Sequence, residues 1–274
     1  MYKNPESGTV SRTTVNTLMK KKQAGEKIVC LTAYDASFSY LLDHSGVDVI
    51  LVGDSLGMVI QGHETTLPVT MDDMVYHTRI VASQCQRALL IADMPFMSYS
   101  NINQALSNAA RLMKESGAHM IKLEGGETQL EVVRHLARSG IPVCAHLGLQ
   151  PQSVHKLGGY RVQGRDKKDA KSMLLSARAL QDVGADMLLL ECVPSSLATD
   201  ITHSVEVPVI GIGAGSECDG QILVLQDVLG ITPGTPPRFS KNFMLGNDSI
   251  QKGIESYVQA VRDGSFPSEE QSFS

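Results

Sequence analysis

The 274-residue sequence contains no tryptophan, and aromatic residues make up only 5% of the chain. Aromatic side chains are the usual stacking surface for the bases of single-stranded nucleic acid, so their scarcity argues against such a partner. The chain also lacks an excess of basic residues, because its formal net charge is -5. A negative balance favours neither nucleic acid nor an anionic membrane. We therefore expect neither as a partner.

Long hydrophobic runs are also absent. No stretch approaches the roughly 18 consecutive apolar residues of a membrane-spanning helix, and the first ten residues, MYKNPESGTV, contain no apolar core of a secretory signal. Apolar residues nevertheless make up 42% of the chain and charged residues 19%, which is the balance of a globular protein with a substantial core. These features predict a cytoplasmic protein.

Cysteine is scarce as well, and its spacing is not that of a metal site. The cysteines are odd in number and include no CxxC pair. Three of them lie in apolar runs that we expect to form strands. We interpret all of them as reduced core residues of an intracellular protein and expect no zinc site. They are Cys30, Cys85, Cys144, Cys192 and Cys218.

What the sequence has in abundance is an alternation of short apolar runs with helix-like segments. The apolar runs are rich in Leu and β-branched residues, and several of the helix-like segments end in glycine, as helices often do. Such an alternation predicts a parallel sheet that is covered on both faces. Seven strong strands are predicted, at 27–35, 48–55, 88–95, 119–126, 141–149, 186–194 and 207–215.

An eighth, weaker strand is predicted at 226–231, QDVLGI. Eight strand–helix units in about 270 residues fit a TIM (βα)8 barrel. A doubly wound sheet has five or six strands and would not use all eight predicted strand–helix units. We therefore predict the TIM barrel.

The two ends of the chain are expected to lie outside the barrel itself. Thr13 or Thr14 could cap an N-terminal helix that ends at Gly25 and covers the main fold. Residues 248–264 are predicted to form a closing helix, a C-terminal extension of the barrel. No change of composition marks a domain boundary, so residues 1–274 are expected to form one domain. Its outer parts would be an N-terminal arm over about 1–25 and a frayed, disordered tail over about 267–274.

Ionisable side chains recur where the predicted strands end. The C-terminal ends of the strands of a TIM barrel meet at one rim, where its active sites are built. Lys122 and Glu124 are two residues apart in one strand and therefore point to the same face. Five of the seven strong strands thus deliver an ionisable group to one place. These groups are Asp54 (followed by Ser55), Asp93, Lys122 with Glu124, His146 and Glu191.

Three of these side chains, Asp54, Asp93 and Glu124, are carboxylates that need a counter-charge. Two unit charges about 4 Å apart repel by roughly 4 kcal/mol at an effective dielectric constant of about 20, so the group would hold either protons or a cation. Oxygen ligands suit Mg²⁺ or Ca²⁺, and a few carboxylates with room for water and substrate favour Mg²⁺. A bound Mg²⁺ could hold a 2-oxo acid and acidify its neighbouring C–H. Lys122 could then neutralise the acid, and Glu191 could take the proton.

Each of these residues also has an ordinary structural interpretation. An Asp at a strand end, such as Asp54 or Asp93, is often a helix cap or turn former. Glu124 precedes two glycines and could be a solvated loop residue, and His146 could be a hydrogen-bonded structural histidine. Lys122 is harder to explain in this way, because a Lys that points into a barrel needs a partner. The set as a whole favours a site, since independent caps would not supply oxygen ligands and a base on one rim.

Two glycine-rich stretches are less informative. GIGAGSECDG (211–220) has Ser216 where the dinucleotide fingerprint has Gly, and it follows a late strand. A turn that lets the backbone approach a ligand is therefore favoured. KLGGYRVQGRD (156–166) is either a mobile lid, with Tyr160 or Arg165 touching a ligand, or an exposed connection.

Long motifs, in order along the chain, carry a resemblance to a known family. They are LTAYD (31–35), LVGDSLGMVIQGHETTLPVT (51–70), ADMPFMSY (92–99), KLEGG (122–126), PVCAHLGLQPQSVHKLGGYRVQGR (142–165), LLLECVP (188–194) and PVIGIGAGSECDGQILVLQDVLGI (208–231). Through them the chain resembles the ketopantoate hydroxymethyltransferase family over roughly residues 10 to 265.

The resemblance implies a TIM barrel of the phosphoenolpyruvate/pyruvate type that assembles as a large homo-oligomer, often a decamer. It also implies transfer of a hydroxymethyl group from 5,10-methylenetetrahydrofolate to 3-methyl-2-oxobutanoate. The product is 2-dehydropantoate, in the first step toward pantothenate and coenzyme A. The reaction would be an aldol-type addition assisted by Mg²⁺.

The resemblance also implies roles for individual residues. Asp54, Asp93 and Glu124 match the Mg²⁺ ligands, and Glu191 matches the proton acceptor. The residues that match contacts to the oxo acid are Ser55 and Lys122, with Asp54 and Asp93 near it as well. His146 matches a position near the substrate without a defined role.

Two other functions stay open. A related Mg²⁺ barrel could cleave or rearrange a 2-oxo acid, in the manner of carboxyphosphonoenolpyruvate mutase or isocitrate lyase. Those enzymes typically use a lid loop with a cysteine, and the corresponding loops here lack an obvious nucleophilic Cys. A barrel that only binds a ligand or scaffolds an assembly would lose no chemistry when the rim acids are changed.

Overall fold

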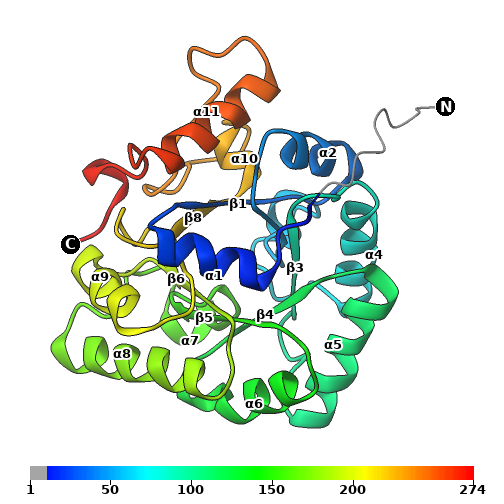
Figure 1. Ribbon diagram of the computed structural model, residues 1–274, viewed down its shortest axis with the longest axis vertical. Helices are drawn as coiled ribbons and strands as arrows, with labels where there is room; N and C mark the ends of the chain where they lie inside the picture. The colour runs from blue at the N-terminus through cyan, green and yellow to red at the C-terminus, as the bar shows by residue number, and fades with distance from the viewer. Residues whose placement is uncertain (1–10) are drawn as a thin grey trace.

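A computed structural model describes residues 11–274. Within that range eight parallel strands close into a barrel in sequence order, with helices around it (Figure 1). The predicted fold class is therefore confirmed, and each of the seven strong predicted strands contains an observed one. The strands are β1 (Ile28–Thr32), β2 (Val49–Val52), β3 (Leu89–Asp93), β4 (Met120–Glu124), β5 (Val143–Gly148), β6 (Met187–Glu191), β7 (Val209–Ile212) and β8 (Gly220–Leu223).

Helices connect most of the strands and pack on the outside of the barrel. The α-helices are α1 (Val15–Ala24), α2 (Ala36–His44), α3 (Leu56–Val59), α4 (Met71–Ala82), α5 (Ile102–Ser116), α6 (Leu130–Arg138), α7 (Val154–Leu157), α8 (Lys167–Asp182), α9 (Ser195–Ser204), α10 (Leu225–Val228) and α11 (Ile250–Arg262). Short 3-10 helices are η1 (Glu127–Gln129), η2 (Pro151–Ser153) and η3 (Glu269–Gln271). No helix within residues 11–274 is long and apolar enough to cross a bilayer.

Helix α5 illustrates how the sequence sets these elements. The Asn101 side chain accepts a hydrogen bond from the Gln104 N–H, which caps the first turn. Ala105, Ala109 and Leu112 are buried, and their spacing of three to four residues puts them on one face. Gly117 ends the helix with φ +81°, a left-handed conformation that glycine adopts without strain. The helix thus buries one apolar stripe against the barrel and the neighbouring α4.

The eighth strand was predicted in the wrong place. It is β8, Gly220–Leu223, and the predicted segment 226–231 instead contains α10. A turn joins β7 to β8 without a helix between them, so the expected regular alternation fails here. At Gly220 a Cβ would lie 2.3 Å from the Ile28 backbone oxygen. The close packing of β8 against β1, which closes the barrel, therefore requires a glycine at this position. The same glycine interrupts the apolar run by which a strand is recognised in the sequence.

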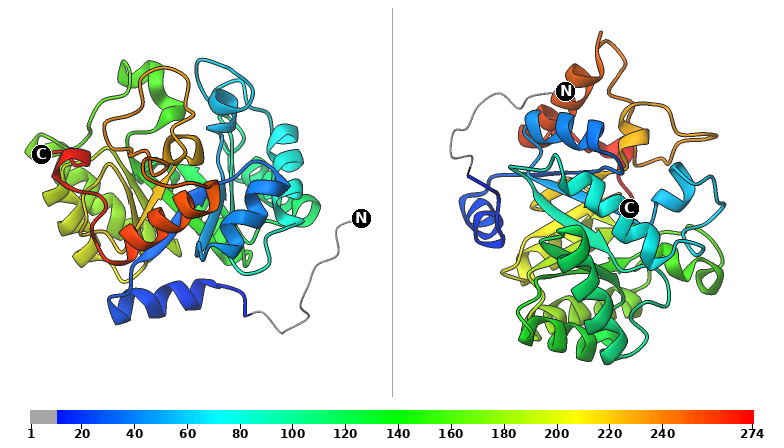
Figure 2. Two further views of the ribbon diagram at one scale, coloured as in Figure 1. Left: turned by 90° about the horizontal axis from the view of Figure 1, so that it is seen from above. Right: turned by 90° about the vertical axis from the view of Figure 1, so that its right-hand side faces the viewer.

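Helix α1 lies across the N-terminal ends of the strands, below the barrel in the left-hand view of Figure 2. Thr14 caps it and Gly25 ends it, as predicted. Leu18 is buried beneath the helix. Lys21 forms an ion pair with Asp48, just before β2, at 2.7 Å. The helix thus covers the main fold as expected, whereas residues 1–10 of the predicted arm lie outside the described residues.

The C-terminal tail differs from the frayed segment that we expected. The backbone oxygen of Phe273 accepts hydrogen bonds from the Ser195 N–H at 2.9 Å and from Ser195 Oγ at 3.1 Å. The Arg238 guanidinium lies 5.5 Å from the centre of the Phe273 ring. The tail is polar by composition, but Ser268 caps η3 and the single phenylalanine anchors the end beside α9. Isolated anchors of this kind leave no periodic signal in a sequence.

We predict that Lys22→Met weakens the fold. Lys22 Nζ donates to Asp219 Oδ2 at 2.8 Å and to the backbone oxygens of Thr202 and Val207 at 3.0 Å each. Loss of these bonds, which leaves Asp219 partly uncompensated, should lower the free energy of unfolding by about 1–3 kcal/mol in a denaturant titration. Lys20→Met, at an exposed position of the same helix, should stay within about 0.5 kcal/mol of the wild type. Equal effects of the two substitutions would contradict this role of α1.

Candidate active site

The structure brings the predicted rim residues together at the C-terminal end of the barrel. Asp93, Glu124 and Glu191 are the last residues of β3, β4 and β6. In the register of the sheet Asp93 is paired with Lys122, and Glu124 is paired with His146 of β5. These strands are parallel, so their ends open on one side of the barrel.

Asp93 and Lys122 form a buried ion pair. Lys122 Nζ lies 2.6 Å from Asp93 Oδ1, and the two side chains are 6% and 2% exposed. Burial alone would lower the pKa of Lys122, but the charges of Asp93, Glu124 and Asp54 raise it well above its usual range. Lys122 is therefore a fixed cation, and the partner that an inward lysine needs is a carboxylate of the rim.

Asp54 is the carboxylate that this single cation does not neutralise. Its side chain is buried, and it follows β2 by two residues. Burial raises its pKa well above the usual range, and the charges of Asp93 and then Glu124 act in the same direction. Three buried acids thus lie near one buried lysine. Such a cluster attracts either a proton or a metal cation.

The helix-cap interpretation of the two aspartates is wrong. The N-cap of α3 is Ser55, without a side-chain cap bond, and the N-cap of α5 is Asn101. Asp93 Oδ2 instead accepts the Asp54 N–H at 3.1 Å, which ties the end of β2 to that of β3. The two acids therefore interact with each other across the rim rather than with helix termini.

Ser55 lies beside the acids and is partly exposed. Its Oγ is 2.7 Å from Tyr34 Oη. Gly53 brings this segment close to β3, because a Cβ there would lie 2.9 Å from Ser55 Oγ and 3.3 Å from Asp93 Oδ2. A hydroxyl thus remains available next to the carboxylates.

His146 lies between two acids of the rim and is 1% exposed. Its Nδ1 is 3.6 Å from Glu124 Oε1, and its Nε2 is 3.3 Å from Glu191 Oε2. Burial and the charge of Lys122 would lower its pKa, but Glu124 and Glu191 outweigh them and raise it to about 9. His146 therefore links the acid of β4 to the acid of β6.

The backbone approaches Glu191 closely. Gly148 has φ +91°, and a Cβ there would lie 2.2 Å from the Glu191 backbone oxygen, so only glycine fits. Cys192, the next residue, has φ +49°, which is uncommon for a residue other than glycine. Functional sites are where such backbone strain tends to occur. The Glu191 carboxylate remains 15% exposed at the end of this turn.

Gln152 is a site residue that the sequence did not reveal. It lies in η2, is 5% exposed, and donates from Nε2 to Asp54 Oδ2 at 2.8 Å. Its backbone N–H donates to Glu124 Oε2 at 3.1 Å, and Tyr99 Oη donates to its Oε1. Gln152 stands in the motif after β5, but a glutamine in a turn carries no chemical signal by itself.

The two glycine-rich stretches have different positions. Tyr160 is 52% exposed, and its Oη lies 3.6 Å from Met58 Sδ of α3, next to the rim. Arg165 is exposed. In the turn after β7, Gly213 and Gly215 have positive φ values, and added Cβ atoms would meet Phe239 and Ser195. This turn therefore approaches other parts of the protein, whereas we expected it to approach a ligand.

The donor set fits a hard cation, although no three His, Cys, Asp or Glu side chains among residues 11–274 form a ready-made metal cluster. Mg²⁺ does not require one, since it is usually held by one or two carboxylates together with water and substrate oxygens. Glu124 Oε1 is buried and has no hydrogen-bond partner in the described part of the chain. Glu124 and the buried Asp54, whose charges repel each other, therefore have the oxygen chemistry that suits a hard cation.

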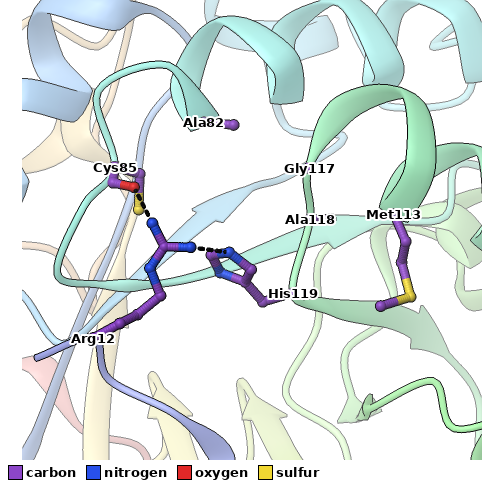
Figure 3. A pocket seen from close by; sticks show the side chains of 7 residues that line it. All are labelled: Arg12, Ala82, Cys85, Met113, Gly117, Ala118 and His119. Carbon is purple, nitrogen blue, oxygen red and sulfur yellow. Dashed lines mark hydrogen bonds between the residues drawn. The ribbon is translucent and has the colours of Figure 1, made fainter.

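A separate cavity of about 410 Å³ lies at the opposite end of the barrel (Figure 3). Arg12 reaches across it and donates to the Cys85 backbone oxygen at 3.0 Å, with His119 beside it. His119 and Cys85 precede β4 and β3, so the cavity is at the N-terminal side of the strands. It does not contain the rim acids.

Comparison with solved structures defines the class of the barrel. Phosphonopyruvate hydrolase superposes with a TM-score of 0.60 at 14% identity, over 80% of this chain and 83% of that one. A crystal structure of 2,3-dimethylmalate lyase, a PEP mutase/isocitrate lyase superfamily member, has a TM-score of 0.56 at 18% identity, over 77% and 80%. The chain thus shares the TIM-barrel fold of these two structures.

Sequence comparison then identifies the family. The model of a family described as ketopantoate hydroxymethyltransferase matches residues 12–269. The 3-methyl-2-oxobutanoate hydroxymethyltransferase of Alkalilimnicola ehrlichii is 61% identical over 100% of this chain and 99% of that protein. The protein of the same name from Halorhodospira halophila is 57% identical over 95% and 94%. The chain belongs to the ketopantoate hydroxymethyltransferase family and is an enzyme.

We predict that none of the cysteines acts as a nucleophile. All five are free and buried, as expected, and burial raises the pKa of every thiol. A thiol-specific reagent at pH 8 should therefore label no cysteine rapidly in the native enzyme, and all five after unfolding. One thiol that reacts stoichiometrically within seconds, and whose modification stops turnover, would favour a lyase or mutase with a cysteine lid.

Proposed function

We propose that this chain transfers a hydroxymethyl group from 5,10-methylenetetrahydrofolate to 3-methyl-2-oxobutanoate and forms 2-dehydropantoate, the first step toward pantothenate and coenzyme A. The observation that carries the proposal is the buried acid cluster with Glu191 across from it, in a chain 55–61% identical to proteins named for this activity. We further propose that the enzyme works in the cytoplasm as a homo-oligomer, in the manner of the decamers of its family.

Asp54, Asp93 and Glu124 are the proposed Mg²⁺ ligands. The fit of Asp54 and Glu124 to a hard cation supports them, and a crystal structure of phosphonopyruvate hydrolase, which has the same fold, is a complex with oxalate and Mg²⁺ (TM-score 0.58, 14% identity, over 94% and 92%). When bound, Mg²⁺ would supply a positive charge that makes the C–H next to the keto group of the oxo acid more acidic. The acids of the chain hold and orient that charge.

Glu191 is the proposed proton acceptor. Its carboxylate is the least buried acid of the rim and lies across from Glu124, with His146 between them. Glu191 takes the proton from C3 of the oxo acid, and C3 then forms the new bond to the one-carbon unit of the folate. The two C–N bonds that hold this carbon to the folate break, and water supplies the hydroxyl group. The proton from C3 and the remaining proton of the water end on the two folate nitrogens, so that tetrahydrofolate leaves. A positioned general base typically contributes about 10²–10⁴ in rate.

Lys122 and Ser55 are the proposed contacts to the oxo acid. Lys122 is already a fixed cation and would balance the negative charge that a 2-oxo acid brings into an acidic site. Ser55 offers a partly exposed hydroxyl at the rim, oriented by Tyr34. His146 was expected near the substrate, but its ring nitrogens face two carboxylates of the enzyme. It is better described as a positioning residue for Glu191 than as a contact to substrate.

The first prediction from this proposal concerns Asp54→Asn. The substitution keeps the shape and can still accept the Gln152 bond, but it removes a charge that Asp93 and Glu124 repel. Without metal the variant should unfold at the same denaturant concentration as the wild type or a higher one. Mg²⁺-dependent turnover should fall at least about 100-fold. Mutation of a residue that only contacts a metal ligand typically lowers metal affinity or activity 10–100-fold, and Asp54 is itself a proposed ligand. An Asp54→Asn enzyme that turns over normally in buffer treated with a chelator would contradict the metal assignment.

The second prediction concerns Glu191→Gln. Loss of the base should lower kcat about 10²–10⁴-fold and leave the dissociation constant of 3-methyl-2-oxobutanoate, measured by calorimetry, little changed. Glu127→Gln is the matched control, because Glu127 is an exposed acid in η1 near the same rim. A Glu191→Gln enzyme with normal kcat would mean that another group removes the proton.

A further inference from the structure

We infer that Gln152 is a positioning residue that sets the spacing of two acids, Asp54 and Glu124, through hydrogen bonds to both. The inference rests on the proposed function, because it gives Gln152 the task of preparing these acids for a divalent cation. The observation behind it is that one residue, on a short turn after β5, contacts the ends of both β2 and β4.

The orientation of the Gln152 amide follows from its partners. Nε2 faces Asp54 Oδ2 at 2.8 Å and the Met94 backbone oxygen at 2.9 Å, and a carbonyl oxygen can only accept. Both N–H groups are thus used. Oε1 accepts from Tyr99 Oη, which in turn lies 3.3 Å from the Glu124 N–H. Every polar atom of the buried amide has a partner, so the side chain has one favourable position.

The same residue holds Glu124 through its backbone. Its N–H donates to Glu124 Oε2 at 3.1 Å, which leaves Oε1 as the buried oxygen without a hydrogen-bond partner in residues 11–274. On the other acid, Gln152 Nε2 donates a hydrogen bond to Asp54 Oδ2. Each acid thus has one oxygen fixed by Gln152, and the other oxygen makes no hydrogen bond to Gln152, although Glu124 Oε1 lies 3.6 Å from His146 Nδ1.

This arrangement predicts an effect on metal affinity rather than on chemistry. A glutamine that orients two metal ligands lowers the free energy needed to bring them together around a cation. Loss of such a residue typically weakens metal affinity 10–100-fold. A glutamine that only fills space in the core would change stability and leave the metal affinity of the folded enzyme unaltered.

The test measures Mg²⁺ binding to the metal-free enzyme by calorimetry, without substrate, for the wild type and Gln152→Met. Methionine has a similar length and no amide. The dissociation constant should rise 10–100-fold, and saturating Mg²⁺ should restore most of kcat. Gln221→Met is the matched control, since Gln221 is also a buried barrel glutamine, with its Nε2 on the Gly215 backbone oxygen at 3.0 Å, and it should bind Mg²⁺ as the wild type does.

A second variant keeps the test decisive if Gln152→Met folds poorly. Tyr99→Phe removes the hydroxyl that donates to Gln152 Oε1 and accepts the Glu124 N–H, and it should weaken Mg²⁺ binding by a smaller factor than Gln152→Met. Wild-type affinity in both folded variants would overturn the inference. Failure of the wild type itself to bind Mg²⁺ would instead contradict the metal assignment of the proposed function, so the two failures are distinguishable.

Discussion

The structure depends on a shortage of positive charge at one end of the barrel. Three buried carboxylates meet there, one just after β2 and two at the ends of β3 and β4. Lys122 is paired with Asp93, and His146 lies between Glu124 and a fourth acid, Glu191. The geometry of a parallel barrel makes this meeting unavoidable, because residues far apart in sequence become neighbours when they end adjacent strands. Burial makes it costly, since each charge loses water and repels the others. The cost is understandable if a divalent cation and an oxo acid complete the cluster during catalysis.

The rest of the fold holds this rim in place. At the opposite end, α1 lies across the strands, with Lys21 and Lys22 bound to acids that precede β2 and β8. Two glycines permit approaches that no other residue could make: Gly220 where β8 meets β1, and Gly148 where β5 passes the backbone of Glu191. The turn η2 then places Gln152 over the acids. The charged groups stand on or next to rigid strands, and short turns with unusual backbone angles set the positions of these groups. An active site on a barrel is expected to be built in this way.

The barrel and its acids could be predicted from sequence because both have strong local signals. Buried parallel strands are continuous apolar runs, and an Asp or Glu at the end of such a run is conspicuous, as at Asp93 and Glu191. The eighth strand could not be located, since Gly220 and Gln221 dilute the pattern where the barrel closes. The packed tail was missed because it depends on Phe273 meeting α9, a long-range contact without periodicity. Gln152 was missed for a related reason: its importance comes from partners 98 residues before it and 28 residues before it, which no spacing rule connects.

In the proposed reaction, the acidic rim and a divalent cation together make the C3 hydrogen of the oxo acid acidic before any folate takes part. The most direct measurement follows exchange of that hydrogen with deuterium from the solvent, by NMR, on 3-methyl-2-oxobutanoate and wild-type enzyme without folate. We expect exchange that requires Mg²⁺, stops on chelation and resumes when Mg²⁺ is added back. Exchange at the same rate in chelator, or exchange that begins only when folate is added, would contradict it.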